Sequence, residues 1–333
     1  MRNLVILLFF ALALGSCETI VAVDTPPHTP RLALSYTLSN QVPTAEYRQF
    51  FGRRNMLVSA SQGVLEVKGL AGRADAIVEL LDETGQVVEQ FRSKPRPGYR
   101  YGSEPNQTDS LLGYYMPVRG FAGEPGSTYT LRASAPDLET VESTLTLPAV
   151  PIIEAGSFTT SQTYQTYPRN QPGRLTCSVL DNAATTDYYV AYGRVLDRNG
   201  QFWGDVRPEY NNSGVDGPEV KLNRFELSNA YSYRQAPFSD ADGNGQRLTI
   251  NADVILQYRG SYNSGNPSVP EPGYVEIIVS SITPDTYRFY QSLQRYYDTD
   301  GNPFAEPAPL HSNVRPGYGL FGGATDVTYR IPL

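Results

Sequence analysis

Large apolar residues recur at every second position over several short stretches of the chain, and turn residues separate these stretches. Leu32, Leu34 and Leu38 alternate with small or polar neighbours, as expected for a strand with one buried face. Residues 76–91 show a similar pattern on both sides of Asp82-Glu83-Thr84-Gly85, which predicts a hairpin. We expect further strands at 64–69, 113–118, 127–133 and 140–147. Because these strands are short and no helical period interrupts them, residues 31–148 are predicted to form an immunoglobulin-like β-sandwich.

The segment Pro148-Ala149-Val150-Pro151 is the best candidate for a domain boundary, because its two prolines cannot join a central strand ladder. Beyond it, β-branched and aromatic residues again favour strands. We expect these at 173–180, 188–196, 201–206, 219–227, 246–258 and 274–282. Asn199-Gly200 is a strong hairpin-turn signal. Residues 149–333 are therefore predicted to form a second antiparallel β domain.

One segment of this second domain has a helical period instead. Thr283 is suited to cap a helix that starts at Pro284. Phe289, Leu293 and Tyr296 then fall on one helical face. We predict a helix near residues 284–297 that packs on the second sheet through this face.

The N-terminus has the order of residues found in a secretory signal. Arg2 precedes an unbroken apolar run from Leu4 to Leu14. As a helix this run would rise only ~16 Å, about half the thickness of a bilayer core. Leu14, Gly15, Ser16 and Cys17 resemble the lipobox of bacterial lipoproteins, in which the cysteine is lipidated and the signal, here residues 1–16, is removed. The alternative is an ordinary secretory signal in which Cys17 has no role.

Residues 17–30 contain three prolines and are predicted to form a Pro-rich tether between the lipid and the first domain. Lipid chains on Cys17 would supply the attachment to the membrane. The chain carries 34 acidic and 27 basic residues, a net charge of −7. This balance argues against nucleic acid as a partner and against electrostatic docking to anionic lipid.

Cysteine and histidine are too scarce for several kinds of site. Cys17 and Cys177 are the only cysteines, so a disulfide framework is excluded. Cys177 lies in a predicted strand and is expected to be a small buried residue, with a reactive thiol as the alternative. His28 and His311 are the only histidines, and neither has a recognisable nucleophile nearby in sequence. We therefore expect no zinc site and no catalytic residue, although a catalytic pair of carboxylates stays open.

Calcium is the one cofactor that the sequence suggests. Asp240, Asp242 and Asn244 fit the opening of a calcium-binding loop, in which oxygen ligands converge around a glycine. The twelfth position is Asn251 and not glutamate, and no helices flank the loop. We therefore expect a simple turn before the strand at 246–258 and no metal ion, with the calcium loop as the alternative.

The segment from 315 to 323 contains four glycines, which flank Tyr318 and follow Phe321. One interpretation is a final irregular strand, because glycine permits close approach of another backbone. The other is a loop on which Tyr318 and Phe321 contact a partner.

The C-terminal region resembles a known protein family. The matching segments are ITPDTYRFYQSL (282–293), DGNPFAEP (300–307), SNV (312–314) and GYGLFGG (317–323), with weaker agreement at PRL (30–32), LPAVP (147–151), DYY (187–189) and FSD (238–240). Together they are similar to a Bacteroidota lipoprotein family known only as domain of unknown function 4249. The resemblance implies an outer-membrane lipoprotein whose gene lies near that of a TonB-dependent receptor. It implies no activity.

We therefore expect a lipid-anchored outer-membrane protein, on either face of that membrane. The leading hypothesis is a non-catalytic accessory or binding component of a TonB-dependent transporter. The alternatives are a structural or adhesive surface lipoprotein and an envelope hydrolase.

Overall fold

The computed structural model describes residues 27–63, 72–94, 113–161, 170–208, 226–230, 232, 235–258, 272–299 and 308–333. Within these ranges the protein is mainly β, as predicted. The predicted signal, the lipobox with Cys17 and most of the tether lie outside the described residues. So do the predicted strand at 64–69 and all but the end of the one at 219–227.

The described strands and helices follow the sequence predictions in most places. The strands are β1 (Leu32–Ser39), β2 (Met56–Ala60), β3 (Ile77–Leu81), β4 (Val87–Ser93), β5 (Tyr114–Pro117), β6 (Thr128–Ala135), β7 (Leu138–Thr146), β8 (Ile152–Thr160), β9 (Asn170–Leu180), β10 (Tyr188–Asp197), β11 (Phe202–Pro208), β12 (Leu227–Ser228), β13 (Phe238–Ser239), β14 (Arg247–Tyr258), β15 (Pro272–Ile282) and β16 (Tyr318–Pro332). The helices are α2 (Ala45–Phe50), the 3-10 turn η1 (Gly52–Arg54) and α4 (Pro284–Thr299).

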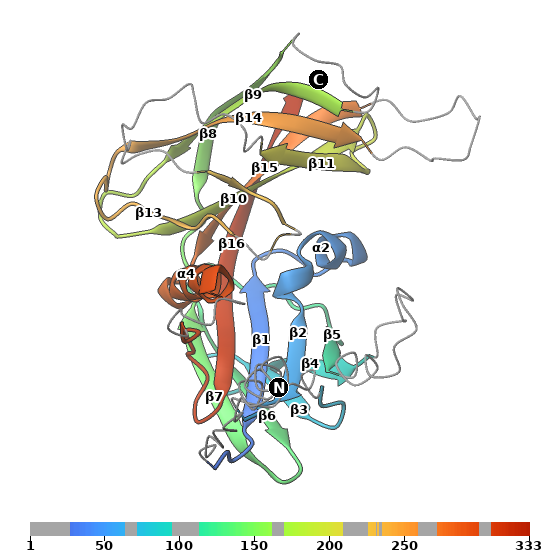
Figure 1. The fold of residues 1–333 in the computed structure, drawn as a ribbon, viewed down its shortest axis with the longest axis vertical. Helices are drawn as coiled ribbons and strands as arrows, with labels where there is room; N and C mark the ends of the chain where they lie inside the picture. The colour runs from blue at the N-terminus through green and yellow to red at the C-terminus, as the bar shows by residue number, and fades with distance from the viewer. Residues whose placement is uncertain are drawn as a thin grey trace, which may run out of the picture.

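All of these strands join one sheet (Figure 1). Neighbours follow the order β7-β6-β3-β4-β5-β2-β1-β16-β15-β10-β11-β14-β9-β8, and β12 and β13 pair with β10 beside this path. The ladder is thus one long open sheet. The finer prediction of an immunoglobulin-like sandwich over residues 31–148 stays a prediction.

Strands β1 to β7 form the lower part of the molecule in Figure 1. The hairpin of β3 and β4 is confirmed, and its turn has Gly85 at a φ of 81°, a value that glycine adopts without a steric penalty. Alternate strand residues point inward and form one core, which consists of Leu32, Leu34, Leu38, Met56, Val58, Val78, Leu80, Phe91, Tyr115, Tyr129, Leu131, Ala133, Val141, Leu145, Leu147, Val314 and Phe321.

The upper part is built from β8 to β11, β14 and β15, and it has a separate core (Figure 1). The turn at Asn199-Gly200 is confirmed, with Gly200 at a φ of 79°. The sequence did not predict β8, which forms one end of the sheet and is mostly exposed. An exposed edge strand needs no alternation of apolar residues, so it leaves little signal in the sequence.

Strand β16 connects the two parts. Its first half pairs in parallel with β1, from Tyr318 to Ala324, and its second half pairs antiparallel with β15, from Ala324 to Pro332. Phe321 therefore belongs to the lower core and Ile331 to the upper one. The predicted boundary at 148–151 does carry the chain from β7 to β8, but the last strand serves both parts. The division into two domains by residue number remains a prediction.

Helices α2 and α4 lie near the level at which β16 passes from one part to the other (Figure 1). A third apolar cluster forms there from Phe50, Phe51, Val190, Tyr192, Ile278, Ile282, Tyr290 and Ala324. Helix α2 was not predicted, because its six residues are too few to show a helical period. Its start is nonetheless encoded locally, since the Thr44 hydroxyl accepts a hydrogen bond from the Tyr47 N–H at 3.1 Å.

Helix α4 confirms the predicted helix and its cap, but the predicted packing face is only partly right: Phe289 packs against the third apolar cluster, as predicted. Its buried residues are Thr286, Tyr290 and Ser292, whereas Tyr296 is 43% exposed. The reason is that the first turn of α4 packs closely on β16. A Cβ atom on Gly322 would lie 2.6 Å from the Thr286 hydroxyl, so the bare backbone of β16 admits the helix at that point.

Candidate functional site

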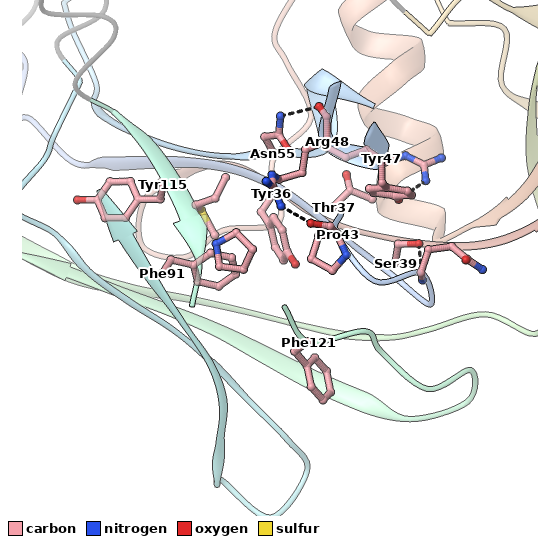
Figure 2. Close-up of a pocket in the computed structure, with 14 residues that line it drawn as sticks. Tyr36, Thr37, Ser39, Pro43, Tyr47, Arg48, Asn55, Phe91, Tyr115 and Phe121 are labelled. Carbon is pink, nitrogen blue, oxygen red and sulfur yellow. Dashed lines mark hydrogen bonds between the residues drawn. The ribbon is translucent and has the colours of Figure 1, made fainter. Parts of the chain in front are cut away.

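A pocket lies in the lower part, beside α2 and between β1, β2, β4 and β5 (Figure 2). Five aromatic side chains, Tyr36, Tyr47, Phe91, Tyr115 and Phe121, contribute to its wall. The rings of Tyr36 and Phe91 meet edge to face, with centroids 5.0 Å apart. The complete lining is Tyr36, Thr37, Ser39, Gln41, Pro43, Tyr47, Arg48, Arg54, Asn55, Met56, Phe91, Tyr115, Pro117 and Phe121.

Hydrogen bonds to the backbone hold the polar side chains of this pocket. The Tyr115 hydroxyl accepts from the Ala76 N–H at 2.9 Å, and the Asn55 amide donates to the Arg48 carbonyl at 3.1 Å. Burial raises the pKa of Tyr36 well above its ordinary value, so its hydroxyl stays protonated. The cavity is small, about 20 Å³, which is room for a water-sized group, and the rings of Phe91 and Tyr115 in its wall are buried.

Behind the pocket, a buried network that we call the waist cluster joins the two parts. It consists of Arg54, Asp326, Ser280, Ser39 and Tyr47. The Arg54 guanidinium donates to both Asp326 oxygens, at 3.0 and 2.8 Å, and to the Ser280 hydroxyl at 2.9 Å. The Ser39 hydroxyl donates to Asp326 at 2.9 Å. Burial alone would lower the pKa of Arg54, but the negative charge of Asp326 raises it well above its ordinary value.

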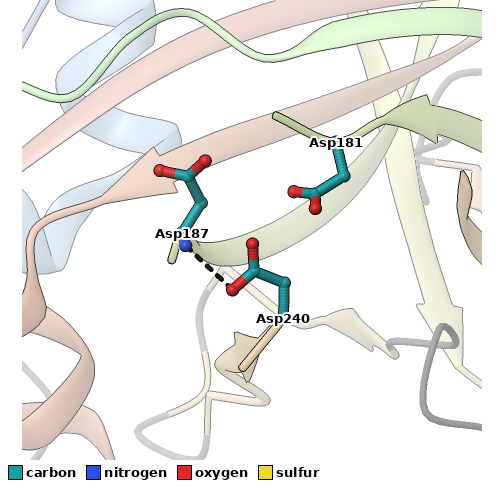
Figure 3. A group of neighbouring side chains, drawn as sticks. All are labelled: Asp181, Asp187 and Asp240. Carbon is teal, nitrogen blue, oxygen red and sulfur yellow. Dashed lines mark hydrogen bonds between the residues drawn. The ribbon is translucent and has the colours of Figure 1, made fainter. Parts of the chain in front are cut away.

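A second buried polar group, which we call the acidic cluster, lies in the upper part and consists of Asp181, Asp187 and Asp240 (Figure 3). Asp181 follows β9, Asp187 precedes β10, and Asp240 follows β13. The pairing of β10 with β13 brings the last two together. One carboxylate oxygen from each residue lies within 4.8 Å of the others. At an effective dielectric constant near 20, two unit charges at that distance repel each other by about 3.5 kcal/mol.

The acidic cluster accepts hydrogen bonds from neutral donors. Asp181 accepts from the Tyr189 hydroxyl at 2.8 Å and from the Gly245 N–H at 2.7 Å. Asp240 Oδ1 accepts from the Asp187 N–H at 2.9 Å. Within the described part of the chain, no arginine or lysine forms a salt bridge with any of the three carboxylates. No described basic side chain therefore neutralises their negative charge.

Asp240 is the most unusual member of this cluster. It is 0% exposed, and its Oδ2 atom is buried without a hydrogen-bond partner. Burial first, and then the negative charges of Asp181 and Asp187, raise its pKa to about 6, against the lowering effect of the Asp187 N–H. An oxygen in this position is costly for the fold unless something binds it.

The three residues of the possible calcium loop, Asp240, Asp242 and Asn244, do not come together in the structure. Asp240 points inward, but Asp242 and Asn244 are exposed and do not converge with it. The residues that do meet Asp240 come from distant parts of the sequence. The turn itself is closed by backbone hydrogen bonds, with Gly243 N–H donating to the Asp240 carbonyl at 2.7 Å. The tight turn directs Asp242 and Asn244 to solvent, and a calcium loop formed by Asp240, Asp242 and Asn244 stays an untested alternative.

Tyr318 and Phe321, the two possible partner contacts near the C-terminus, differ in exposure. Phe321 is 0% exposed in the lower core, so it cannot contact a partner. Tyr318 is 46% exposed and remains a candidate contact. The glycine-rich segment is a strand, and Gly319 has a φ of 108° with the Leu34 carbonyl only 1.8 Å from where a Cβ would stand. The segment therefore forms a final strand and not a loop.

The described cysteine and histidines, Cys177, His311 and His28, each contact other residues of the fold. Cys177 is 3% exposed, and burial raises the pKa of its thiol to about 12, so the reactive-thiol alternative is wrong. His311 Nε2 lies 2.8 Å from Asp285 Oδ1 and ties the segment before β16 to α4. His28 Nε2 lies 3.1 Å from the Ser61 hydroxyl on the surface. Among the described residues no carboxylate bonds to His28, so this pair lacks the third member of a catalytic triad.

Sequence reasoning found Asp240 but missed the partners in both buried clusters. Asp187 lies in the DYY segment (187–189) that resembles the family, and this resemblance is the signal that could have pointed to it. Asp181, Arg54 and Asp326 carry no local pattern, since each meets its partners through long-range strand pairing.

Two further observations bear on membrane location and on relatives. Among the described residues, no helix combines the length and the apolar character needed to cross a membrane. The sequence model of a family described as a domain of unknown function (DUF4249) matches residues 24–330. A search of curated proteins gives no match.

Proposed function

Because the chain belongs to the DUF4249 family, whose description assigns no activity, we propose its function from its own residues: a lipid-anchored outer-membrane protein that acts as a non-catalytic accessory or binding component of a TonB-dependent transporter. The observation that carries this proposal is the order of residues before Cys17. A positive residue, a short apolar run, Gly15-Ser16 and then Cys17 are what signal cleavage and lipidation require. The family match starts at residue 24, directly after this region.

The pocket beside α2 supports a binding role. Its aromatic rings are held by packing, and its hydroxyl and amide groups are held by hydrogen bonds to the backbone. Such preorganised groups lose little entropy when a ligand binds. The cavity of about 20 Å³ admits a water-sized group, so we expect only a small polar part of a ligand to enter here.

The same geometry supports a non-catalytic role over the hydrolase alternative. The only close group of three acids among the described residues is the acidic cluster, and none of its members lines the pocket. A catalytic carboxylate must reach the substrate. Asp181 and Asp240 are buried, so they are poorly placed to do so.

The lipid anchor can be tested by metabolic labelling with radioactive palmitate. We expect the wild-type protein to be labelled and to sediment with the outer membrane. Cys17→Ser should abolish the label and release the protein into the aqueous fraction. Cys177→Ser is the matched control, since Cys177 is buried and would keep both the label and the location. An unlabelled wild-type protein that washes into the aqueous fraction would overturn the proposal.

The partner can be tested by gentle purification from native outer membranes after chemical cross-linking. We expect a β-barrel receptor to be recovered with the wild-type protein in comparable amount. Recovery of the lipidated protein alone would contradict a transporter role while leaving the anchor intact. If, in addition, deletion of the gene left nutrient uptake unchanged but altered surface attachment, the structural or adhesive alternative would replace it.

A further inference from the structure

We propose that the acidic cluster is a Ca²⁺ site whose protein ligands are Asp181, Asp187 and Asp240. This ligand set differs from the one that the sequence suggests, because Asp242 and Asn244 are not part of it. The site is independent of the lipid anchor and of the pocket, so its test does not depend on the proposed function.

The first argument is the position of the oxygen atoms. Ca²⁺ binds oxygen at about 2.4 Å, so the ligands of one ion lie up to about 4.8 Å apart. The three carboxylates each offer an oxygen within 4.8 Å of the others. In Figure 3 the carboxylates of Asp181 and Asp187 lie on either side of the free oxygen of Asp240.

The second argument is independent of the clustering. Asp240 Oδ2 is fully buried, accepts no hydrogen bond and points into the space between the other two carboxylates (Figure 3). Its sister atom Oδ1 is held by the Asp187 N–H at 2.9 Å, so the carboxylate cannot turn away without losing that bond. A fixed, buried and unpartnered oxygen is the feature that a cation would satisfy.

The third argument is the charge and type of the surrounding donors. Every hydrogen bond that the described residues donate to the carboxylates comes from a neutral group, namely the Tyr189 and Thr185 hydroxyls and the N–H groups of Asp187 and Gly245. Hydroxyl oxygens can join the coordination shell, whereas an arginine would have competed with the ion. The three carboxylates and the two hydroxyls are oxygen ligands, which hard cations prefer.

Ca²⁺ fits this cluster better than Mg²⁺. The ligands come from the end of β9, the start of β10 and the turn after β13, so their relative positions are set by the strands. Ca²⁺ accepts irregular geometry and variable coordination, whereas Mg²⁺ requires a near-ideal octahedron at about 2.1 Å and keeps much of its water. The bound ion would tie these three segments together at one corner of the upper part.

The competing explanation is a proton shared between Asp181 and Asp240, which would also reduce the repulsion. The two explanations differ in what they predict after chelation. A shared proton makes the protein indifferent to CaCl₂, whereas an ion site makes it more stable when CaCl₂ is added.

The test uses the full-length protein in detergent, treated with EDTA, freed of chelator and then titrated with CaCl₂ in a calorimeter at pH 7.5. We expect one ion per chain with a Kd of about 10⁻⁶–10⁻³ M. At about 100 times the Kd, thermal unfolding should shift upward by roughly 5 °C. MgCl₂ should bind at least about tenfold more weakly.

Two variants locate the site. Asp240→Asn keeps the shape and the acceptor for the Asp187 N–H, and it should weaken Ca²⁺ binding at least about tenfold. Asp242→Asn is the matched control in the same turn and should bind like the wild type. Tb³⁺ luminescence excited through tyrosine gives a second readout, because Tyr189 lies against the site. The signal should fall in Tyr189→Phe more than in the exposed control Tyr318→Phe.

Each of the other outcomes overturns the proposal. No heat of binding and no thermal shift in the wild type would favour the shared proton. Equal binding by the wild type and Asp240→Asn would place the ion elsewhere. Loss of binding in Asp242→Asn with retention in Asp240→Asn would return the site to the loop suggested by the sequence.

Discussion

The waist cluster and the acidic cluster are both buried groups of polar side chains, but they differ in charge balance. In the waist cluster, the Arg54 guanidinium donates to both oxygens of Asp326, and the hydroxyls of Ser39, Ser280 and Tyr47 accept or donate the remaining hydrogen bonds. In the acidic cluster, three carboxylates share only neutral donors, and one oxygen has no partner. The same residue type, aspartate, is therefore stabilising in one place and a source of repulsion in the other.

The comparison suggests different roles for the two clusters. The waist cluster connects η1, β1, β15 and β16, so its residues hold the lower and upper parts together. It is complete without any ligand, although Arg54 Nε has no hydrogen-bond partner and stacks instead near the Phe51 ring, with the guanidinium carbon 3.9 Å from the centroid. The acidic cluster connects loops at one corner and is complete only with a cation. Buried charge alone therefore does not mark a binding site; unbalanced buried charge does.

The largest expected effect is at Asp326. Asp326→Asn removes the negative charge but leaves the buried Arg54 guanidinium without its counter-ion, so we expect the free energy of unfolding to fall by about 3–5 kcal/mol. Denaturant unfolding measures this loss. Asp253→Asn is the control, because Asp253 pairs with Arg174 at 3.0 Å but both side chains remain partly exposed. If both variants lost the same free energy of unfolding, burial would not make the waist ion pair more important for stability than a partly exposed pair.

A smaller loss is expected when the acidic cluster loses a donor. Tyr189→Phe removes the hydroxyl that donates to Asp181 at 2.8 Å and leaves a buried carboxylate oxygen with one donor fewer. We expect a destabilisation of about 1–2 kcal/mol in Ca²⁺-free buffer. The comparison variant is Tyr318→Phe, whose ring is 46% exposed and which should unfold like the wild type. If Tyr189→Phe left the free energy of unfolding unchanged, a water molecule would have replaced the hydroxyl as the donor to Asp181.

Replacing aspartate with asparagine is expected to change the free energy of unfolding in opposite directions at Asp326 and at Asp240. In Ca²⁺-free buffer, Asp240→Asn relieves repulsion from Asp181 and Asp187 and keeps the hydrogen bond from the Asp187 N–H. We therefore expect stability to be unchanged or to rise by up to about 2 kcal/mol, opposite in sign to Asp326→Asn. Parallel denaturant curves for the two variants measure this difference. Destabilisation of both by similar amounts would contradict the contrast between the clusters.

Local features of the fold could be predicted from the sequence, and features that depend on distant pairing could not. The cap at Thr283 and the hairpin turn at Gly85 are written in a few adjacent residues, and both are confirmed. The buried face of α4 was predicted only in part, because Gly322, some thirty residues later, decides which side of the helix can approach β16 most closely. Sequence periodicity contains no information about that contact.

The candidate sites show the same limit. A calcium-loop motif correctly singled out Asp240, yet its partners Asp187 and Asp181 lie far away in sequence and meet it through the pairing of β10 with β13. Phe321 was a reasonable surface contact as part of a glycine-rich loop. It became a core residue because β16 inserts beside β1. In each case the residue type was informative, but the long-range strand order determined its role.

The smallest effect is expected at an exposed ion pair with nearly the same geometry as the waist pair. Arg73 and Asp75 lie 2.7 Å apart, and Arg54 and Asp326 lie 2.8 Å apart, but the side chain of Asp75 is 49% exposed. The hydrogen bond from Arg73 lowers the pKa of Asp75 below its ordinary value. The pair therefore stabilises the fold above the unfolded pKa of Asp75, near 3.8, and this contribution is lost as the pH falls through the lower folded value. Because water and salt screen it, Asp75→Asn should cost less than about 1 kcal/mol at pH 7 and low salt.

Denaturant unfolding of Asp75→Asn and wild type at pH 7 and pH 3, each at 0.05 and 0.5 M NaCl, would measure this effect. We expect the difference to shrink at high salt and at low pH, while the loss in Asp326→Asn persists at high salt because the waist pair is shielded from ions. If the exposed pair instead matched the waist pair in size and in salt resistance, hydrogen-bond geometry would outweigh burial. The charge balance of a buried cluster would then be a poor guide to whether it holds the fold together or binds an ion.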